Sequence, residues 1–255
     1  RDVGPRDDPQ PLVLIHGTSA SLHTWEGWVK ALSAAHRVIS FDLPGFGLTG
    51  PSPGEDYRGD TYARFVLALM DQLKVPRFAL AGNSLGGEVA WRTALMAPQR
   101  VTRLILVDAA GPDFKSDSVP VGFLVARIPL INRMVDTVLP RSMVVASVRK
   151  VYGDPSRVNE ALVDRYYELT LREGNRRALV QRLQQNRRGQ DAEHIRELKL
   201  PTLILWGGQD RLIPPSVGEQ FKRDIAGSEL VVFDDLGHVP HEEDPQRTVA
   251  VVQAF

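Results

Sequence analysis

The chain has 255 residues, in which 31 Lys and Arg balance 31 Asp and Glu, and it contains no cysteine. This length suits one large α/β domain or two modest domains, and the zero net charge argues against nucleic acid as a partner, because proteins that bind phosphate backbones usually carry a basic excess. The absence of cysteine excludes disulfides, thiolate nucleophiles and cysteine-ligated metal centres.

Apolar runs and segments of helical periodicity alternate along most of the chain. In chain order, the pattern predicts a strand at Leu12–Ile15, a helix at Thr24–Leu32, a strand at Val38–Phe41, a helix at Thr61–Leu73, a strand at Phe78–Ala81, a helix at Leu85–Met96 and a strand at Leu104–Val107. The alternation resumes with a strand at Thr202–Trp206, a helix at Pro215–Ile225, a strand at Leu230–Phe233 and a helix at Asp244–Phe255. Continuous apolar strands predict a mostly parallel sheet with helices on both faces, in which ligands bind beyond the carboxyl ends of the strands.

The interval 113–196 interrupts this alternation. It contains helical patterns at Val121–Arg127, Leu130–Val138, Met143–Val151, Val158–Leu171 and Arg176–Asn186, and no convincing strand. With 15 Lys and Arg against 10 Asp and Glu, the interval carries a net charge of +5, while the remainder, with 16 against 21, carries −5. We therefore predict a basic helical insertion at 113–196 within an α/β core formed by residues 1–112 and 197–255.

The strongest chemical signal is a Gly-x-Ser-x-Gly motif, GNSLGG at positions 82–87, where a predicted strand meets a predicted helix. A serine on such a sharp turn projects its hydroxyl above the sheet, and the glycines beside it remove Cβ atoms that would collide there. The backbone N–H of Leu85, at the helix start, points toward any oxyanion formed at this place. Short motifs of this kind also occur by chance, so the strand-to-helix context carries the prediction that Ser84 is a nucleophile.

A serine nucleophile needs a base and an acid that orients the base. His238 follows the last predicted strand and is the predicted base, whereas His241 is interpreted as a surface or helix-entry histidine. Asp210 follows the strand Thr202–Trp206 through a glycine turn and is the predicted acid. Asp108, at the end of the preceding strand, is the competing acid, and its alternative role is to cap the loop that follows it. The order Ser84, Asp210, His238 is the one expected for this architecture.

The loop after the first predicted strand, HGTSAS at positions 16–21, is the expected source of a second oxyanion donor. The backbone N–H of Thr18 is the predicted donor, and Gly17 allows the close turn. We interpret His16 as a side chain that hydrogen-bonds the backbone and holds this loop. This chemistry requires no metal and no organic cofactor.

Together these motifs resemble the α/β-hydrolase superfamily, in particular its carboxylesterase- and lipase-like serine hydrolases with a helical cap. The resemblance covers nearly the whole chain and rests on HG at 16–17, DLPGFG at 42–47, GNSLGG at 82–87, WGGQD at 206–210 and GH at 237–238. It implies that the Asp42 loop is mainly structural and that the interval 113–196 is a cap that roofs the acyl pocket. Members usually open with an antiparallel strand pair, which we expect to be missing or truncated here.

Two details narrow the resemblance. Ser84 argues against dehalogenase-like and epoxide hydrolase-like members, which carry aspartate at the nucleophile position. Asn83 also precedes the serine in carbon–carbon bond hydrolases of the meta-cleavage type, but those have a His-Gly-x-Gly-Pro-Gly oxyanion loop, which TSAS at 18–21 does not match.

The predicted function is the hydrolysis of carboxylic esters through an acyl-enzyme intermediate. The same triad also serves carbon–carbon bond hydrolases, lactonases and perhydrolases, and a slow-turnover ligand receptor would keep the same fold. The expected partner is a small ester with an apolar acyl or alcohol group. Any membrane contact is expected to come from a segment upstream of Arg1 or from the basic cap. We expect a monomer or dimer. The sequence does not indicate a localisation, and the cytoplasm is the default expectation.

Overall fold

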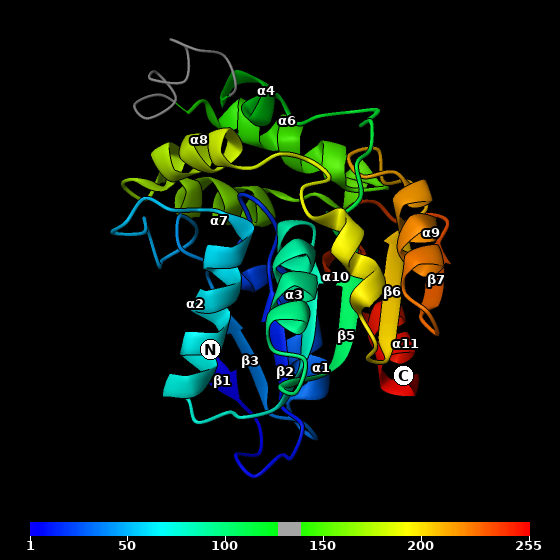
Figure 1. Cartoon of the computed structure of the whole chain (residues 1–255). Helices are drawn as coiled ribbons and strands as arrows, with labels where there is room; N and C mark the ends of the chain where they lie inside the picture. Colours follow the sequence, from blue (N-terminus) through cyan, green and yellow to red (C-terminus); the bar gives the residue numbers. More distant parts are fainter. Residues whose placement is uncertain (127–138) are drawn as a thin grey trace.

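A mostly parallel sheet with helices on both faces forms the centre of the molecule (Figure 1). The computed structural model describes residues 1–126 and 139–255. Across the described residues the sheet has seven strands in the order β1-β3-β2-β4-β5-β6-β7, with β1 antiparallel to β3 and every other neighbouring pair parallel. The strands are β1 Asp2–Val3, β2 Leu12–Ile15, β3 Val38–Phe41, β4 Phe78–Asn83, β5 Val101–Val107, β6 Thr202–Gly207 and β7 Glu229–Phe233. The predicted α/β fold is therefore confirmed.

Helices cover the two faces of the sheet in two groups. Helices α1 (Glu26–Leu32) and α11 (Pro245–Ala254) pack on one face, and α2 (Gly59–Gln72), α3 (Leu85–Met96) and α9 (Pro215–Asp224) pack on the other. The shorter elements are η1 Leu22–Trp25, η2 Pro155–Arg157, η3 Ala192–Glu197 and α10 Pro240–Glu243. Successive side chains of β2 pack into the hydrophobic clusters on opposite faces of the sheet, because alternate side chains of a strand point to opposite faces. This two-sided burial explains why the strands read as continuous apolar runs.

Two elements differ from the sequence-based expectations. The antiparallel pair expected to be missing or truncated is represented by one short antiparallel strand, β1, whose Asp2 carboxylate accepts hydrogen bonds from Arg37 at 3.0 and 2.9 Å. The helix predicted at Asp244–Phe255 is preceded by the separate helix α10, and Asp244 caps α11 by accepting a hydrogen bond from the backbone N–H of Arg247 at 3.1 Å. Pro245 at the start of α11 favours this boundary because proline suits the first turn of a helix.

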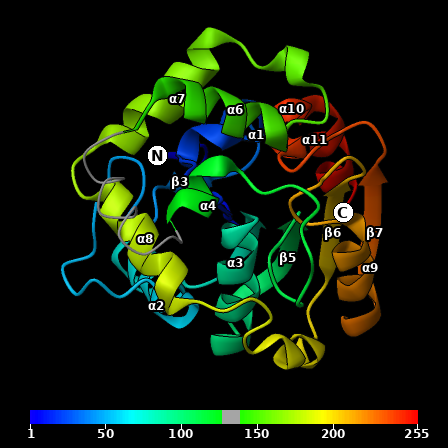
Figure 2. The ribbon, with the colours of Figure 1, turned by 90° about the horizontal axis from the view of Figure 1, so that it is seen from above.

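A layer of helices lies over the carboxyl ends of the strands. It consists of α4 Val121–Ala126, α6 Arg141–Val151, α7 Glu160–Leu171 and α8 Asn175–Gln185. Each of these helices contacts the next, and α8 contacts α4 in turn, so that the layer forms a ring above the sheet (Figure 2). The described residues of the interval 113–196 contain helices and no strand, in agreement with the sequence pattern, and the predicted helix Leu130–Val138 lies outside the described residues. None of the helices described is both long and apolar enough to cross a membrane.

Ion pairs join this basic helical layer to the acidic core. Arg165 of α7 lies 3.1 Å from Glu26 of α1, and Arg177 of α8 lies 3.1 Å from Glu55. Such exposed pairs contribute at most about 1 kcal/mol each. These pairs connect the two parts of the chain that carry opposite net charge.

Candidate active site

Ser84 occupies the turn between β4 and α3. Its backbone has φ 54° and ψ −115°, a conformation that few residues other than glycine adopt. Hydrogen bonds on both sides hold the turn: the Ser84 N–H donates to the carbonyl of Val107 at 3.0 Å, and the Ser84 carbonyl accepts from the N–H groups of Glu88 and Ala110 at 3.1 and 3.0 Å. The side chain is thereby fixed above the carboxyl end of the sheet.

The glycines of the motif make this turn sterically feasible. A Cβ atom on Gly82 would lie 2.0 Å from the carbonyl oxygen of Gly86, and one on Gly86 would lie 2.1 Å from the carbonyl oxygen of Ile15. Both contacts involve backbone atoms of packed elements, which cannot yield as a flexible side chain does.

Gly86→Ala is expected to destabilise the protein by about 2–3 kcal/mol, the upper part of the range for overpacking, because the new methyl group meets backbone. Gly54→Ala is the matched control, since a Cβ atom there has no neighbour within 4 Å. Denaturant unfolding of both variants tests this expectation. Equal midpoints for the two would show that the turn tolerates a side chain.

The structure brings His238 and Asp210 together as predicted from the sequence. His238 is 5% exposed, and its Nδ1–H donates to Oδ2 of Asp210 at 2.6 Å. The other carboxylate oxygen of Asp210 accepts hydrogen bonds from the backbone N–H groups of Leu212 and Ile213 at 2.8 and 3.0 Å. The backbone of its own turn thus holds Asp210 in place. Asp210 in turn orients the imidazole of His238 so that Nε2 is available to accept a proton.

Asp108, the competing acid, has a different partner. Its Oδ1 accepts the backbone N–H of Gly207, at the end of β6, at 2.9 Å, so it does not cap the loop that follows it. The side chain is fully buried. Burial, together with the nearby charge of Asp210, raises the pKa of the Asp108 carboxyl well above its usual range. Of the two candidates, Asp210 is therefore the one that orients the histidine.

Asn83, directly before the serine, links the nucleophile turn to the histidine loop. Its Nδ2 donates to the carbonyl oxygens of Val107 at 3.1 Å and of His238 at 2.9 Å. The sequence marks this position only through its neighbour Ser84. The structure shows that the asparagine holds the backbone of the predicted base.

Glu243 is a second residue that the sequence does not single out. Its buried carboxylate accepts backbone N–H groups from Gly237 at 2.9 Å, Gly153 at 3.0 Å and Asp154 at 2.9 Å. The N–H of His238 also donates to the carbonyl of Val151, at the end of α6, at 2.7 Å. The loop that carries the histidine is therefore hydrogen-bonded directly to the helical layer, and a shift of the layer at this end would move His238.

Two further histidines are buried and lie outside this arrangement. His16 donates from Nδ1 to the carbonyl of Gly17 at 2.7 Å and accepts the N–H of Leu43 at Nε2 at 3.0 Å, so it holds the loop as expected. His241 was predicted to lie at the surface or at a helix entry, and the first part is wrong: its ring is fully buried against Trp25, with centroids 4.0 Å apart. Burial lowers the pKa of His241 to about 3, which keeps the ring neutral.

The loop that contains Thr18 passes directly over the nucleophile turn. A Cβ atom on Gly17 would lie 2.8 Å from Oδ1 of Asn83 and 3.2 Å from Cβ of Ser84, so glycine permits this approach. Thr18 lines the same cavity as Ser84. Thr18 and Leu85, the two residues expected to bind an oxyanion through their backbone N–H groups, therefore both lie next to the serine.

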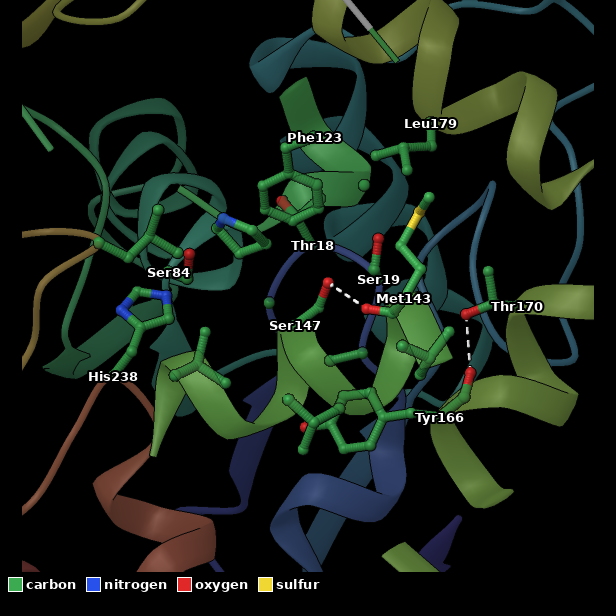
Figure 3. A pocket seen from close by; sticks show the side chains of 18 of the residues that line it. Thr18, Ser19, Ser84, Phe123, Met143, Ser147, Tyr166, Thr170, Leu179 and His238 are labelled. Carbon is green, nitrogen blue, oxygen red and sulfur yellow. Dashed lines mark hydrogen bonds between the residues drawn. The ribbon is translucent and has the colours of Figure 1, made fainter. Parts of the chain in front are cut away.

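A cavity of about 320 Å³ extends from Ser84 and His238 beneath the helical layer (Figure 3). The two side chains lie at one end, and Met143, Thr170 and Leu179 lie toward the other. Apolar side chains dominate its wall: Phe123, Leu139, Met143, Val144, Val148 and Leu179.

Three hydroxyl groups that the helical layer places on the cavity wall are engaged by the protein. Ser147 donates to the carbonyl of Met143 at 2.8 Å, Thr170 donates to the carbonyl of Tyr166 at 2.7 Å, and the Tyr166 hydroxyl donates to Glu242 at 2.8 Å. These groups consequently offer few free donors to a ligand, and this side of the cavity is effectively apolar.

A second, smaller cavity of about 120 Å³ meets the first at the nucleophile. The two share Thr18, Ser84, Phe123 and Leu212, and the second is also lined by polar side chains, Glu88, Arg182, Asn186 and Gln190. A ligand centred on Ser84 thus has an apolar space and a more polar space within reach.

Glu242 of α10 fastens helix α7 next to the apolar cavity. Burial raises the pKa of Glu242 to about 7, and hydrogen bonds from Tyr166 and Tyr152 oppose this shift. The proton on this carboxyl is therefore held more tightly in the folded chain than in the unfolded one.

The Glu242 contribution to stability should fall between pH 4.5, its ordinary pKa, and about 7. In that range the folded chain binds the proton and the unfolded chain has lost it, so the free energy of unfolding decreases as the pH rises. Glu242→Gln keeps an acceptor for Tyr166 and removes the titration. Unfolding curves measured from pH 4 to 8 should show wild type losing stability relative to this variant, and parallel curves would contradict the assignment.

Comparison with known proteins agrees with this architecture. The α/β-hydrolase fold family matches residues 10–245. A 2-hydroxy-6-oxo-2,4-heptadienoate hydrolase of Pseudomonas putida is 30% identical, with 100% of this chain and 90% of that protein covered. Among solved structures, the meta-cleavage product hydrolase of Pseudomonas fluorescens IP01 is 27% identical with a TM-score of 0.84, covering 100% of this chain and 92% of that one. An esterase of Thermogutta terrifontis is 26% identical with a TM-score of 0.82, covering 100% and 90%. The fold, the serine turn and these relatives together show that the chain is a hydrolase belonging to the α/β-hydrolase fold family.

Proposed function

We propose that the protein is a serine hydrolase that cleaves carboxylic esters through an acyl-enzyme intermediate. The observation that carries the proposal is the placement of Ser84 and His238 at one end of an apolar cavity, with His238 hydrogen-bonded to Asp210 at 2.6 Å. This arrangement has the three roles that acyl transfer requires: a nucleophile, a base and an acid that orients the base.

In the first half of the reaction, Oγ of Ser84 attacks the ester carbonyl carbon, and Nε2 of His238 takes the hydroxyl proton. Asp210 keeps the other proton on Nδ1 and stabilises the imidazolium that forms. The backbone N–H groups of Thr18 and Leu85 bind the oxyanion of the tetrahedral intermediate. Collapse of this intermediate breaks the bond to the alcohol oxygen, which leaves with the proton returned by His238.

In the second half, water attacks the acyl group on Ser84. His238 accepts a proton from the water and returns it to Oγ of Ser84 when the carboxylic acid departs. These proton transfers are carried out by side chains of the chain itself.

The substrate class follows from the two cavities that meet at Ser84. The larger, apolar cavity of about 320 Å³ suits an apolar acyl or alcohol group, and the smaller one of about 120 Å³, with Glu88 and Arg182 on its wall, suits a shorter and more polar group. We propose that helices α4, α6, α7 and α8 act as a cap over this site.

Cleavage of a carbon–carbon bond is the second candidate function. It is favoured by similarity to a meta-cleavage product hydrolase and to a 2-hydroxy-6-oxo-2,4-heptadienoate hydrolase. Asn83, which links the nucleophile turn to the carbonyl of His238, also favours it. The loop TSAS at 18–21 argues the other way, because its sequence differs from the oxyanion loop expected for such enzymes.

Substrate comparison distinguishes the candidates. Purified protein is given a series of 4-nitrophenyl esters with acyl chains from two to ten carbons and, separately, a vinylogous 1,5-diketone acid. We expect steady turnover of esters with a maximum at intermediate chain length, and slow or no cleavage of the diketone. Faster cleavage of the diketone than of every ester would assign the carbon–carbon reaction, and one equivalent of product without further turnover would assign a receptor.

A further inference from the structure

Two buried carboxyl groups lie side by side behind the predicted base. One carboxyl oxygen of Asp108, one carboxyl oxygen of Asp210 and one ring nitrogen of His238 all lie within 4.8 Å of one another. Asp108 is 0% exposed, and its Oδ2 is buried without a hydrogen-bond partner among the described residues. An ionised carboxylate in this position would place a second negative charge beside Asp210 in a site that is buried from solvent.

The hydrogen-bond donors around the three neighbouring carboxyl groups are unequally distributed. Asp210 accepts from Leu212, Ile213 and His238, and Glu243 accepts three backbone N–H groups. Asp108 accepts only the N–H of Gly207 among the described groups. Because donors stabilise a carboxylate, Asp108 is the member of this group that is least able to hold a charge.

We propose that Asp108 is a protonated carboxylic acid at neutral pH and that its proton lies on the unpartnered Oδ2, donated to Asp210. Two carboxyl groups this close cannot both ionise at low cost, so one proton is retained between them. Asp108 is therefore a positioning residue: it supplies Asp210 with a further donor and acts on His238 only through Asp210.

The acidic groups that face Asp108 agree with a neutral state. His238 is the third titratable neighbour, and its Nδ1–H is already paired with Asp210 at 2.6 Å. Asp210 and Glu243 are the acidic neighbours, and both raise the pKa of the Asp108 carboxyl in addition to burial. Gly207 supplies the single backbone donor, and its hydrogen bond lowers the pKa of the Asp108 carboxyl. Neutral Asp108 leaves one net negative charge beside the imidazole instead of two.

The kinetic test compares Asp108→Asn with Asp108→Ala, and this arm rests on the proposed ester hydrolysis. The amide of Asp108→Asn is neutral and can still donate to Asp210, so kcat should remain within about threefold of wild type, and the acid limb of the kcat/KM pH profile should move by less than about 0.3 unit. Asp108→Ala removes the donor and should lower kcat about tenfold with KM nearly unchanged. If Asp108 were ionised, Asp108→Asn would remove a negative charge and shift the acid limb downward by more than about one unit, because an anion this close favours the protonated base.

The second arm needs no substrate, so its failure is distinguishable from failure of the proposed function. Infrared spectra at pH 7 should contain the carbonyl stretch of a protonated carboxyl group that persists in Glu242→Gln, which removes the other carboxyl group with a raised pKa, and disappears in Glu242→Gln/Asp108→Asn. Thermal unfolding confirms that each variant is folded. Absence of this band in folded Glu242→Gln would overturn the proposal, even if every ester assay failed.

Discussion

Ser84→Ala is expected to lower kcat for ester hydrolysis by a factor on the order of 10⁴ to 10⁶ while KM changes little. The hydroxyl forms the covalent bond to the acyl group, and no neighbouring hydroxyl is expected to replace it. Ser147 and Thr170 line the same cavity but donate to carbonyls of their own helices. Steady-state kinetics on a short-chain aryl ester, with enzyme concentrations high enough to detect the residual rate, measure this loss.

Ser147→Ala is the matched control for this experiment. It removes a serine hydroxyl from the same cavity, whose hydrogen bond to Met143 is internal to helix α6. We expect kcat to stay within about twofold of wild type. Wild-type activity in Ser84→Ala, or an equal loss in both variants, would contradict the assigned nucleophile.

Asp210→Asn is expected to lower kcat by about 10⁴, although it preserves the shape of the site. The N–H groups of Leu212 and Ile213 hold one oxygen of this side chain, so the amide nitrogen of the variant must face His238. An amide donor at that position forces the imidazole to carry its proton on Nε2, which can then no longer accept the proton of Ser84.

The control for Asp210→Asn is Asp234→Asn, an exposed carboxylate that follows strand β7. It changes the net charge equally and should leave kcat within about twofold of wild type. Activity of Asp210→Asn within tenfold of wild type would show that another group orients His238, and Asp108, the other carboxyl in this cluster, would be the first candidate.

Much of the fold could be predicted because its signals are local. Continuous apolar runs mark the buried parallel strands, and the glycines around Ser84 mark a turn whose backbone allows no Cβ atom at Gly82 or Gly86. The short strand β1 was not predicted, since two residues carry no periodicity and it is positioned by pairing with β3. The last predicted helix is divided into α10 and α11 because Asp244 caps α11. Whether Asp244 caps a helix depends on the direction in which the chain enters α11, which the sequence does not specify.

In the candidate site, too, local sequence patterns indicate some residues, whereas only tertiary packing determines the others. The sequence singled out Ser84, Asp210 and His238 because each follows a predicted strand, and parallel strands bring such positions to one edge. It did not single out Glu243, whose three N–H partners come from residues 6, 89 and 90 positions away in the chain. Of the two positions predicted for His241, the helix entry agrees with α10 and the surface does not, because no local sequence pattern indicates the stacking on Trp25. Contacts of this kind are created by tertiary packing and have no local pattern.

Covalent labelling of the nucleophile shows whether Ser84 is activated by His238 and Asp210. A fluorophosphonate reacts only with a serine hydroxyl activated by a base, so it reports the assembled triad without any choice of substrate. Peptide mapping after labelling should place one equivalent on Ser84 in wild type, none in Ser84→Ala, and a strongly slowed reaction in His238→Ala. A folded wild-type protein that takes up no label, or takes it up at Ser19 or Ser147, would show that Ser84 is not the nucleophile.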